Sequence, residues 1–177
     1  MVVGPGAESF FEGDALTARY LNVADASALQ ALFEACPDYY LLGTGGPPTP
    51  NAADEMYVEL PPGKTLDDKF LLGLFDDAGC LHGVIDLIRD FPDTGRWYLG
   101  LFLLRPTWRS QGLGARVHEA LLGWVRALGA QTLRLGVVER NWAAGRFWSR
   151  LGYQPIATTH TVVGTQDNQV IVMARHV

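Results

Sequence analysis

The ten residues RPTWRSQGLG (105–114) decide how this sequence is interpreted, because they separate two segments of different character. The preceding run WYLGLFLL (97–104) predicts a strand, and ARVHEALLGWVRAL (115–128) carries apolar residues at about the 3.6-residue spacing of a helix. A helix that begins directly after such a loop leaves its first N–H groups without partners and carries partial positive charge. The junction therefore predicts a binding site for an anion, with a plain capped turn as the alternative.

Glycines and an arginine within this junction favour a phosphate or diphosphate as that anion. Gly112 and Gly114 have no Cβ, so a phosphate can approach the main chain without a steric penalty, and Arg109 adds a formal charge. The full Walker pattern Gly-x-x-x-x-Gly-Lys-Ser/Thr does not occur in the sequence, because the Gly63-Lys64-Thr65 triplet has Val58 where the first glycine is required. The dinucleotide fingerprint needs a third glycine where this chain has Val117. Both of these nucleotide-binding loops are therefore excluded.

The order of the remaining segments predicts a mixed α+β domain. Apolar runs predict strands at 16–22, 69–76, 80–90, 97–104, 132–139, 153–163 and 168–177. Helices are predicted at 26–36, 113–128 and 141–152, with shorter ones at 38–42 and 53–60. Asp25 is expected to cap the first helix. Strands that follow one another through turns should be antiparallel, and only the strand–helix–strand section should be parallel. We expect one domain over residues 1–177, with residues 1–14 as a flexible tail.

Length and composition limit the possible function classes. The chain has 177 residues, of which 48% are hydrophobic and 19% charged, as in an ordinary folded domain. Its formal charge of -5 argues against a nucleic-acid partner and mildly favours a cationic small partner. Neither a membrane span nor a signal peptide is expected, which favours a cytoplasmic location. Cys36 and Cys80 lie far apart without metal-ligand spacing, so neither a disulfide nor a zinc site is expected.

Two motifs in the middle of the chain resemble those of the GNAT superfamily of acyl-CoA-dependent N-acyltransferases. RSQGLG (109–114) matches its Arg/Gln-x-x-Gly-x-Gly/Ala signature. NWAAGRFWSRLGYQPI (141–156) is similar to its second motif, which has Asn-x-x-Ala, an aromatic pair and then Leu-Gly-Phe/Tyr. The two motifs stand in the expected order and about the expected distance apart. The resemblance implies a three-layer fold whose mixed central sheet of about seven strands is splayed between the fourth (97–104) and fifth (132–139) strands, with helices on both faces.

The resemblance further implies acetyl-CoA or coenzyme A as the cofactor. Its pantetheine arm would lie between the two splayed strands, and its diphosphate would lie on the main-chain amides of the junction. The residues implied to bind it are Leu103, Leu104, Arg105, Arg109, Ser110, Gln111, Gly112, Leu113, Gly114, Ala115, Asn141, Ala144, Phe147 and Trp148. Core packing is the alternative for Phe147 and Trp148, because both lie on a predicted helix.

Several residues are candidates for moving the proton. Many members of the superfamily place a tyrosine acid where this chain has Trp148, whose indole N–H cannot usefully donate its proton. Tyr98 stands where some relatives carry an acidic base, and a phenol can relay a proton or position water. Asp86 shares a strand face with apolar residues, which should raise its pKa toward that of a useful base unless it bonds to a neighbouring strand or loop. Glu139 is a further candidate, and direct loss of the proton to solvent is the remaining alternative.

The acceptor side is implied to lie in the segment 38–64, which precedes the second strand. Asp38, Tyr39 and Tyr40 are predicted to bind the substrate, because a carboxylate among aromatic rings can hold a cationic amine. The alternative is a solvated loop with buried tyrosines. The four histidines show no metal-ligand spacing, so no metal is expected.

These features together predict an enzyme, an acetyl-CoA-dependent N-acetyltransferase. It would transfer the acetyl group to a primary amine of a small molecule or peptide by direct attack in a ternary complex. Trp148 at the usual tyrosine position keeps open a non-catalytic acyl-CoA-binding or regulatory module of the same fold. The hydrophobic C-terminal strand 168–177 makes a homodimer possible, although an interior strand explains it equally well. No nucleic-acid or membrane partner is expected.

Overall fold

The computed structural model describes residues 11–13 and 16–177 of the chain, and in that part eight strands form one sheet. The strands are β1 (Glu12–Gly13), β2 (Leu16–Tyr20), β3 (Lys69–Asp76), β4 (Leu81–Ile88), β5 (Arg96–Leu104), β6 (Thr132–Val138), β7 (Gln154–Val163) and β8 (Gln166–His176). The helices are α1 (Ala26–Glu34), α2 (Pro37–Thr44), α3 (Ala52–Val58), α4 (Leu113–Ala127) and α5 (Trp142–Arg150), with short 3₁₀ turns η1 (Val23–Asp25), η2 (Leu66–Asp68) and η3 (Pro106–Trp108). Seven of the strands match the predicted ones. The eighth, β1, lies within the predicted tail 1–14, most of which falls outside the described residues.

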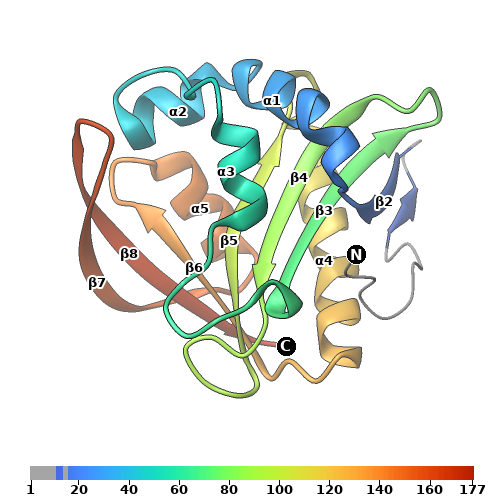
Figure 1. The fold of residues 1–177 in the computed structure, drawn as a ribbon. Coiled ribbons are helices and arrows are strands. Elements are labelled where there is room, and N and C mark those ends of the chain that lie inside the picture. Colours follow the sequence, from blue (N-terminus) through green and yellow to red (C-terminus); the bar gives the residue numbers. More distant parts are fainter. Residues whose placement is uncertain (1–10, 14–15) are drawn as a thin grey trace.

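The sheet has the predicted mixture of strand directions. Its order is β1-β2-β3-β4-β5-β6-β8-β7. Neighbouring strands run antiparallel everywhere in the described sheet except for β5 and β6, which are parallel and are joined by α4 (Figure 1). A parallel pair needs a crossover connection, and the long amphipathic helix supplies it. The predicted pattern, in which turns join the strands between 69 and 104 and a helix joins the next pair, is therefore confirmed.

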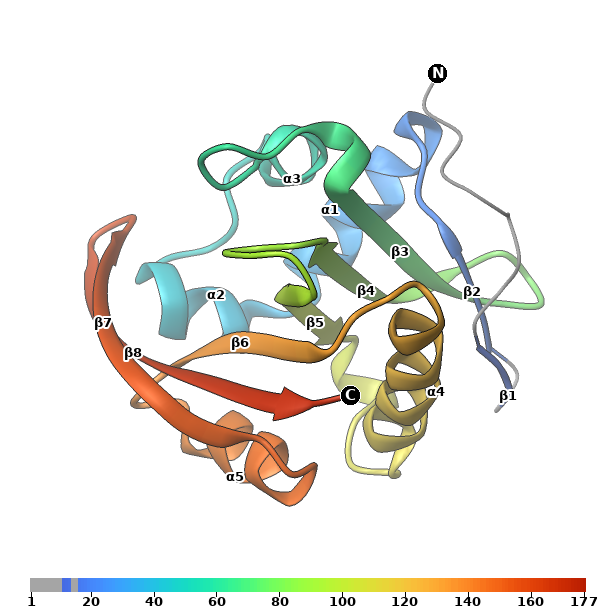
Figure 2. The same cartoon turned by 90° about the horizontal axis from the view of Figure 1, so that it is seen from below.

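Helices cover both faces of this sheet, which gives the predicted three layers. Helices α1, α2 and α3 lie on one face, and α4 and α5 lie on the other (Figure 2). Each face has its own apolar cluster: Leu29, Leu32 and Phe33 of α1 pack on the first, and Val117 and Leu121 of α4 on the second. Burial of these side chains stabilises both layers, at about 25 cal/mol for each Å² of apolar surface.

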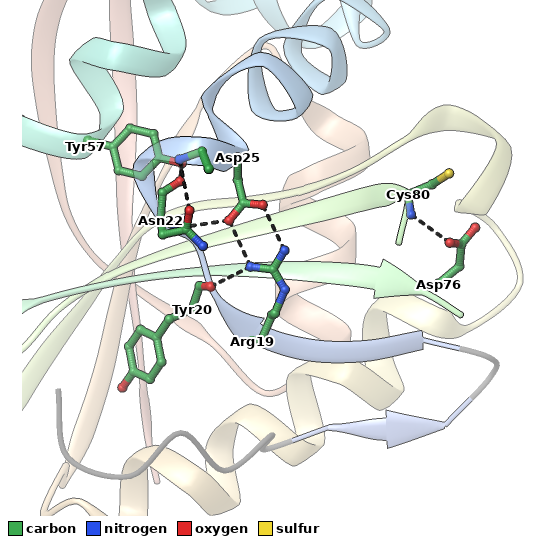
Figure 3. A network of polar contacts seen from close by, with 8 residues as sticks. Arg19, Tyr20, Asn22, Asp25, Tyr57, Asp76 and Cys80 are labelled. Atoms are coloured by element: carbon green, nitrogen blue, oxygen red, sulfur yellow. Dashed lines mark hydrogen bonds and ion pairs between the residues drawn. The ribbon is translucent and has the colours of Figure 1, made fainter. Parts of the chain in front are cut away.

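A polar network fixes the first helices to the edge of the sheet (Figure 3). The Arg19 guanidinium donates to both oxygens of Asp25 at 2.8 Å, and the hydroxyl of Tyr57 in α3 donates to the Asn22 carbonyl at 2.7 Å. Asp25 stands at the N-cap position of α1, as predicted, but its side chain makes no capping bond, because its carboxylate accepts from Arg19 and from the Asn22 N–H instead. The Asn22 side chain caps the preceding turn by accepting from the Ala24 N–H.

Two further observations concern the surroundings of the chain. None of the helices in the described residues is long and apolar enough to cross a membrane. Both cysteines are free: Cys36 is buried and Cys80 is exposed. Burial raises the pKa of the Cys36 thiol, so it stays protonated and unreactive at neutral pH.

Candidate functional site

The parallel strands β5 and β6 separate halfway along their length. They pair from Arg96 opposite Thr132 to Leu99 opposite Leu135, and no pairs follow. Strand β5 continues to Leu104 while β6 ends at Val138, so the two strands diverge as a V. Unpaired main-chain groups on the inner edges of such a V must find other partners. The implied splay between the two strands is confirmed, and its open end is the predicted site.

A bulge in β5 lies where the strands part. In the pairing of β4 with β5, Asp86 faces Leu101 and Leu87 faces Leu99, so Gly100 has no partner in β4. It also lies beyond the last pair with β6. A Cβ at this position would stand 3.0 Å from an oxygen of Asp86, so glycine is the residue that fits. The bulge therefore leaves an exposed main-chain unit at the inner end of the V.

Beyond the bulge, strand alternation decides which main-chain groups face the opening. The Arg105 N–H donates to the His82 carbonyl of the β4 side at 2.8 Å, so Arg105, and by alternation Leu103, direct their main-chain groups toward β4. Phe102 and Leu104 then direct theirs into the V. Of the predicted pantetheine contacts Leu103, Leu104 and Arg105, the alternation favours Leu104. It also indicates Phe102 as a contact that the sequence did not predict.

The loop before α4 presents a run of free N–H groups. Ser110 and Gly112 have positive φ angles of 64° and 76°, which turn the chain back sharply. In the described part of the chain, no protein group accepts from the N–H groups of residues 110–114. The Ala115 N–H is already used, since it donates to the Gly112 carbonyl at 3.1 Å. Five of the six predicted amides are thus available to an anion, and residues 110–112 are exposed.

Arg109 stands beside this loop but is not a free charge at its rim. Its Nε donates to the Leu104 carbonyl at 2.7 Å, and its Nη1 pairs with Asp38 of α2 at 2.5 Å. Its Nη2 is buried and finds no acceptor among the described residues. Because Nη2 is buried, the groups presented to a diphosphate are the free amides of the loop itself. The described residues therefore fit the group that the sequence implies.

Aromatic side chains fill the space between the loop and α5. Phe147 stacks on Phe102 with centroids 6.5 Å apart, and a Cβ on Gly114 would lie 3.3 Å from the Phe147 ring. Gly114 therefore also serves close packing of α4 on α5. Trp148 is 8% exposed and makes edge contacts with Phe102 and Tyr153. The core-packing alternative holds for Trp148, whereas Phe147 is only half-buried.

The predicted pantetheine contacts of α5 begin at its first residues. The Asn141 side chain accepts from the Ala144 N–H at 3.1 Å and so caps the helix. This use occupies its oxygen and leaves its NH₂ group as a donor. Ala144 is half-buried on the side of α5 that packs on the core. Both residues lie just after the end of β6, at the open end of the V, as the prediction for the pantetheine arm requires.

Asp86 lies against the bulge, paired with a residue that the sequence did not indicate. Lys69 at the start of β3 brings its Nζ within 2.7 Å of the Asp86 carboxylate, and both side chains are buried. Burial raises the pKa of Asp86, and the Lys69 ammonium opposes this rise. The alternative of a carboxylate bonded to a neighbouring strand is therefore what the geometry favours for Asp86.

Tyr98 reaches across the inner end of the V. Its hydroxyl lies 3.0 Å from the position that a Cβ of Gly136 in β6 would take. Burial raises the pKa of Tyr98, with the Arg134 guanidinium acting in the opposite direction, so the phenol is protonated at neutral pH. Gly136 is a site residue that sequence reasoning missed, although a glycine inside a strand signals a close approach of this kind.

The three predicted acceptor residues of α2 take three different roles. Asp38 is paired with Arg109. Tyr40 is 9% exposed and packs against Phe33, with ring centroids 5.5 Å apart. Although 37% of Tyr39 is exposed, its hydroxyl is withdrawn from water, which raises its pKa to about 12, with smaller contributions from Glu59 and Tyr98. Tyr39 is therefore the one of the three that is neither paired with Arg109 nor buried in the core.

A separate groove of about 550 Å³ lies on the far side of α5. It is lined by residues of α5, β6 and β8, among them Trp142, Ser149, Ile171 and Met173. Of the residues singled out from the sequence, it contains Asn141 and Glu139. The groove and the V are thus two different features of the surface.

Comparisons with known proteins agree with this geometry. The sequence model described as "Acetyltransferase (GNAT) family" matches residues 29–153. No curated protein matches the chain in sequence.

Solved structures share the fold at low sequence identity. A probable GNAT acetyltransferase from Chromobacterium violaceum has a TM-score of 0.78 at 19% identity, with 98% of this chain and 88% of that one covered. An acetyltransferase from Thermus thermophilus has a TM-score of 0.73 at 21% identity, covering 92% and 97%. The ribosomal-protein-S18-alanine N-acetyltransferase from Escherichia coli has a TM-score of 0.67 at 17% identity, covering 91% and 93%.

Proposed function

The chain belongs to the GNAT family of acetyltransferases, and from this premise we propose that it transfers the acetyl group of acetyl-CoA to a primary amine of a small molecule or peptide. The amine attacks directly, in a ternary complex with both substrates bound. Acetyl-CoA supplies a thioester, which is the activated acetyl group. The E. coli neighbour is named for acetylating an alanine of ribosomal protein S18, so the fold is compatible with a peptide amine.

The observation that supports this proposal most directly is the run of free N–H groups at 110–114. They stand at the start of α4, where the helix dipole favours negative charge, and residues 110–112 are exposed. These groups would hold the diphosphate. The main chain of Phe102 and the NH₂ of Asn141 would hold the pantetheine arm within the V.

Two residues at the inner end of the V have the chemistry that amine acylation needs. The exposed main chain of the Gly100 bulge has no partner residue in either neighbouring strand, so we assign its N–H the role of polarising the thioester carbonyl. Tyr98 stays protonated at neutral pH and can give its proton to the leaving thiolate, and the phenolate that remains can take up the proton that the amine nitrogen loses on forming the amide. We assign the acid role to Tyr98, because this chain has Trp148 at the position where many members of the family have a tyrosine acid. Asp86 then serves to hold the bulge rather than to accept the proton.

Binding and turnover are tested separately. Acetyl-CoA should raise the melting temperature, with a gain of about 2.7 kcal/mol in unfolding free energy at one hundred times Kd. Thiol release is then measured over polyamines, amino acids, aminoglycosides and peptide N-termini. Absence of any thermal shift contradicts the proposal. Binding without turnover on any amine would instead support the non-catalytic acyl-CoA-binding module.

The role of Tyr98 is tested by Tyr98→Phe, with Tyr20→Phe as the matched control. The Tyr20 hydroxyl is buried and makes no hydrogen bond within the described residues, so its removal should leave turnover unchanged. Loss of the acid should lower kcat about 10²-fold or more without weakening acetyl-CoA binding. Equal kcat values for the two variants would remove Tyr98 from the mechanism.

A further inference from the structure

Helix α2 spans the open end of the V and is fastened at both of its ends. Figure 1 shows α2 between the end of β5 and the β7–β8 hairpin, and Figure 2 shows it above β6. The sequence predicted this helix only as a short segment near the acceptor. Its attachments to the two arms of the V join residues that are far apart in the chain.

The first attachment joins the start of α2 to the end of β5. Arg109 donates to the Leu104 carbonyl, which ends β5, and also pairs with Asp38 in the first turn of α2. The Cys36 thiol, just before the helix, is 3.7 Å from the same carbonyl. One arginine therefore fixes both the strand end and the helix start.

The second attachment joins the end of α2 to β8 and to the residues that follow β6. Asn168, which is 1% exposed, donates from its Nδ2 to the Gly43 carbonyl at 2.8 Å. Its Oδ1 accepts from the Arg140 guanidinium. Arg140 also donates to the Leu42 carbonyl at 3.4 Å and to the Gln166 side chain at 2.7 Å. A buried amide with both ends bonded holds its partners in one geometry.

Main-chain contacts tighten this second attachment. The Thr165 N–H at the hairpin turn donates to the Thr44 carbonyl at 3.2 Å. A Cβ at Gly164 would stand 2.6 Å from that same carbonyl, and a Cβ at Gly45 would stand 2.6 Å from the Thr165 hydroxyl. Such spacing leaves no room for a substrate chain between α2 and the hairpin.

We propose that α2 with these two attachments acts as a strap that limits the acceptor to small amines, a proposal that rests on the proposed function. Tyr98 lies on β5, whose end the first attachment joins to α2, and its hydroxyl faces Gly136 of β6, the strand that leads to Arg140 of the second attachment; an amine that reaches Tyr98 therefore lies beneath the strap. A small amine needs one opening to reach this position. In a polypeptide, the chain continues on both sides of an internal lysine, so its binding needs a groove that is open at both ends. The strap closes one end of such a groove.

The test compares one ε-amine in two settings. The small acceptor is Nα-acetyl-lysine methylamide, and the large one is an eleven-residue peptide with a blocked N-terminus and a single central lysine. Arg140→Ala and Asn168→Ala loosen the second attachment. Gln169→Ala is the control, because Gln169 stands next to Asn168 in β8 but bonds to Glu139, just after β6, and not to α2. The ratio of kcat/KM for the peptide to that for the small acceptor should rise about tenfold in the first two variants, as expected for loss of one or two hydrogen bonds, and stay unchanged in the control.

Hydrogen exchange in the absence of any substrate gives a second readout. The amides of residues 42–46 should exchange at least tenfold faster in Arg140→Ala, which keeps the proposal testable if the buried Asn168 variant does not fold. A wild-type protein that acetylates the peptide as fast as the small acceptor overturns the proposal. So does an unchanged ratio, an unchanged exchange rate, or inactivity of all variants on both acceptors. Acetyl-CoA binding, measured alongside, shows separately whether the proposed function itself has failed.

Discussion

Replacing Asp86 by asparagine should destabilise the protein severely, because it leaves the Lys69 ammonium buried without a counter-charge. The Lys69 Nζ lies 2.7 Å from the Asp86 carboxylate, and the two side chains are only 4% and 11% exposed. The carboxylate also lies against the Gly100 bulge. The expected effect is therefore on folding and on the shape of the V at the same time.

The magnitude follows from the distance and the burial of the pair. At an effective dielectric constant of about 20, two charges at this separation attract by roughly 6 kcal/mol, and the desolvation of both groups offsets much of that. Removing one partner of a buried pair costs about 3–5 kcal/mol. We expect Asp86→Asn to cost this amount. Lys69→Met should cost less, because Asp86, whose pKa burial already raises, can take up a proton in the folded state.

Urea unfolding at pH 7, followed by far-UV circular dichroism, measures the free energy of unfolding of Asp86→Asn, of Lys69→Met and of the double variant. The coupling energy between the two positions should be about 2 kcal/mol or more. The cost of Lys69→Met should shrink as the pH is lowered from 7 toward 4, because the folded state then binds a proton that the unfolded state does not. An Asp86→Asn protein that loses less than about 1 kcal/mol and yet loses all turnover would refute this reasoning. Asp86 would then be the catalytic base.

Three other predictions concern single side chains. Burial lowers the pKa of His118 to about 4 from its ordinary 6.5. As the pH is lowered from 6.5 to 4, the unfolded state therefore binds a proton that the folded state does not. The free energy of unfolding should fall by up to about 3 kcal/mol over this range. His118→Asn should flatten this dependence in urea titrations at pH 7, 5 and 4, and an unchanged slope contradicts the assignment. Gly112→Ala, at a φ of 76°, should weaken acetyl-CoA binding about tenfold by calorimetry, because a side chain strains the loop that presents the amides. Gly123→Ala, where a Cβ meets nothing within 4 Å, should stabilise α4 by about 0.5–1 kcal/mol and leave that affinity unchanged.

Local patterns predicted most of the secondary structure because they depend on neighbours in the chain. The apolar run 97–104 and the helical spacing after it correspond to β5 and α4. The free N–H groups at 112–114 follow from the helix start itself, since an α-helix always leaves its first donors without internal partners. Gly112 at positive φ fits the same local reasoning.

Side-chain partners across the fold did not follow from the sequence in this way. Arg109 was expected at the rim of the anion site, but it pairs with Asp38, which stands 71 positions earlier. Asp38 was expected to meet the amine and instead fixes α2. Lys69 gave no signal, because its position opposite Asp86 depends on the register between two strands and on the bulge beside them.

The sequence by itself determined the order of strands and helices, the parallel step between β5 and β6, and the amide-lined start of α4. These features depend on hydrophobic period and on backbone donors, both of which are properties of short segments. Only the tertiary structure decided that α2 spans the V, that Asp86 is neutralised by Lys69 and that Tyr98 faces the gap. Each of these depends on long-range packing, which brings distant residues within hydrogen-bond distance only after the register of the whole sheet is fixed.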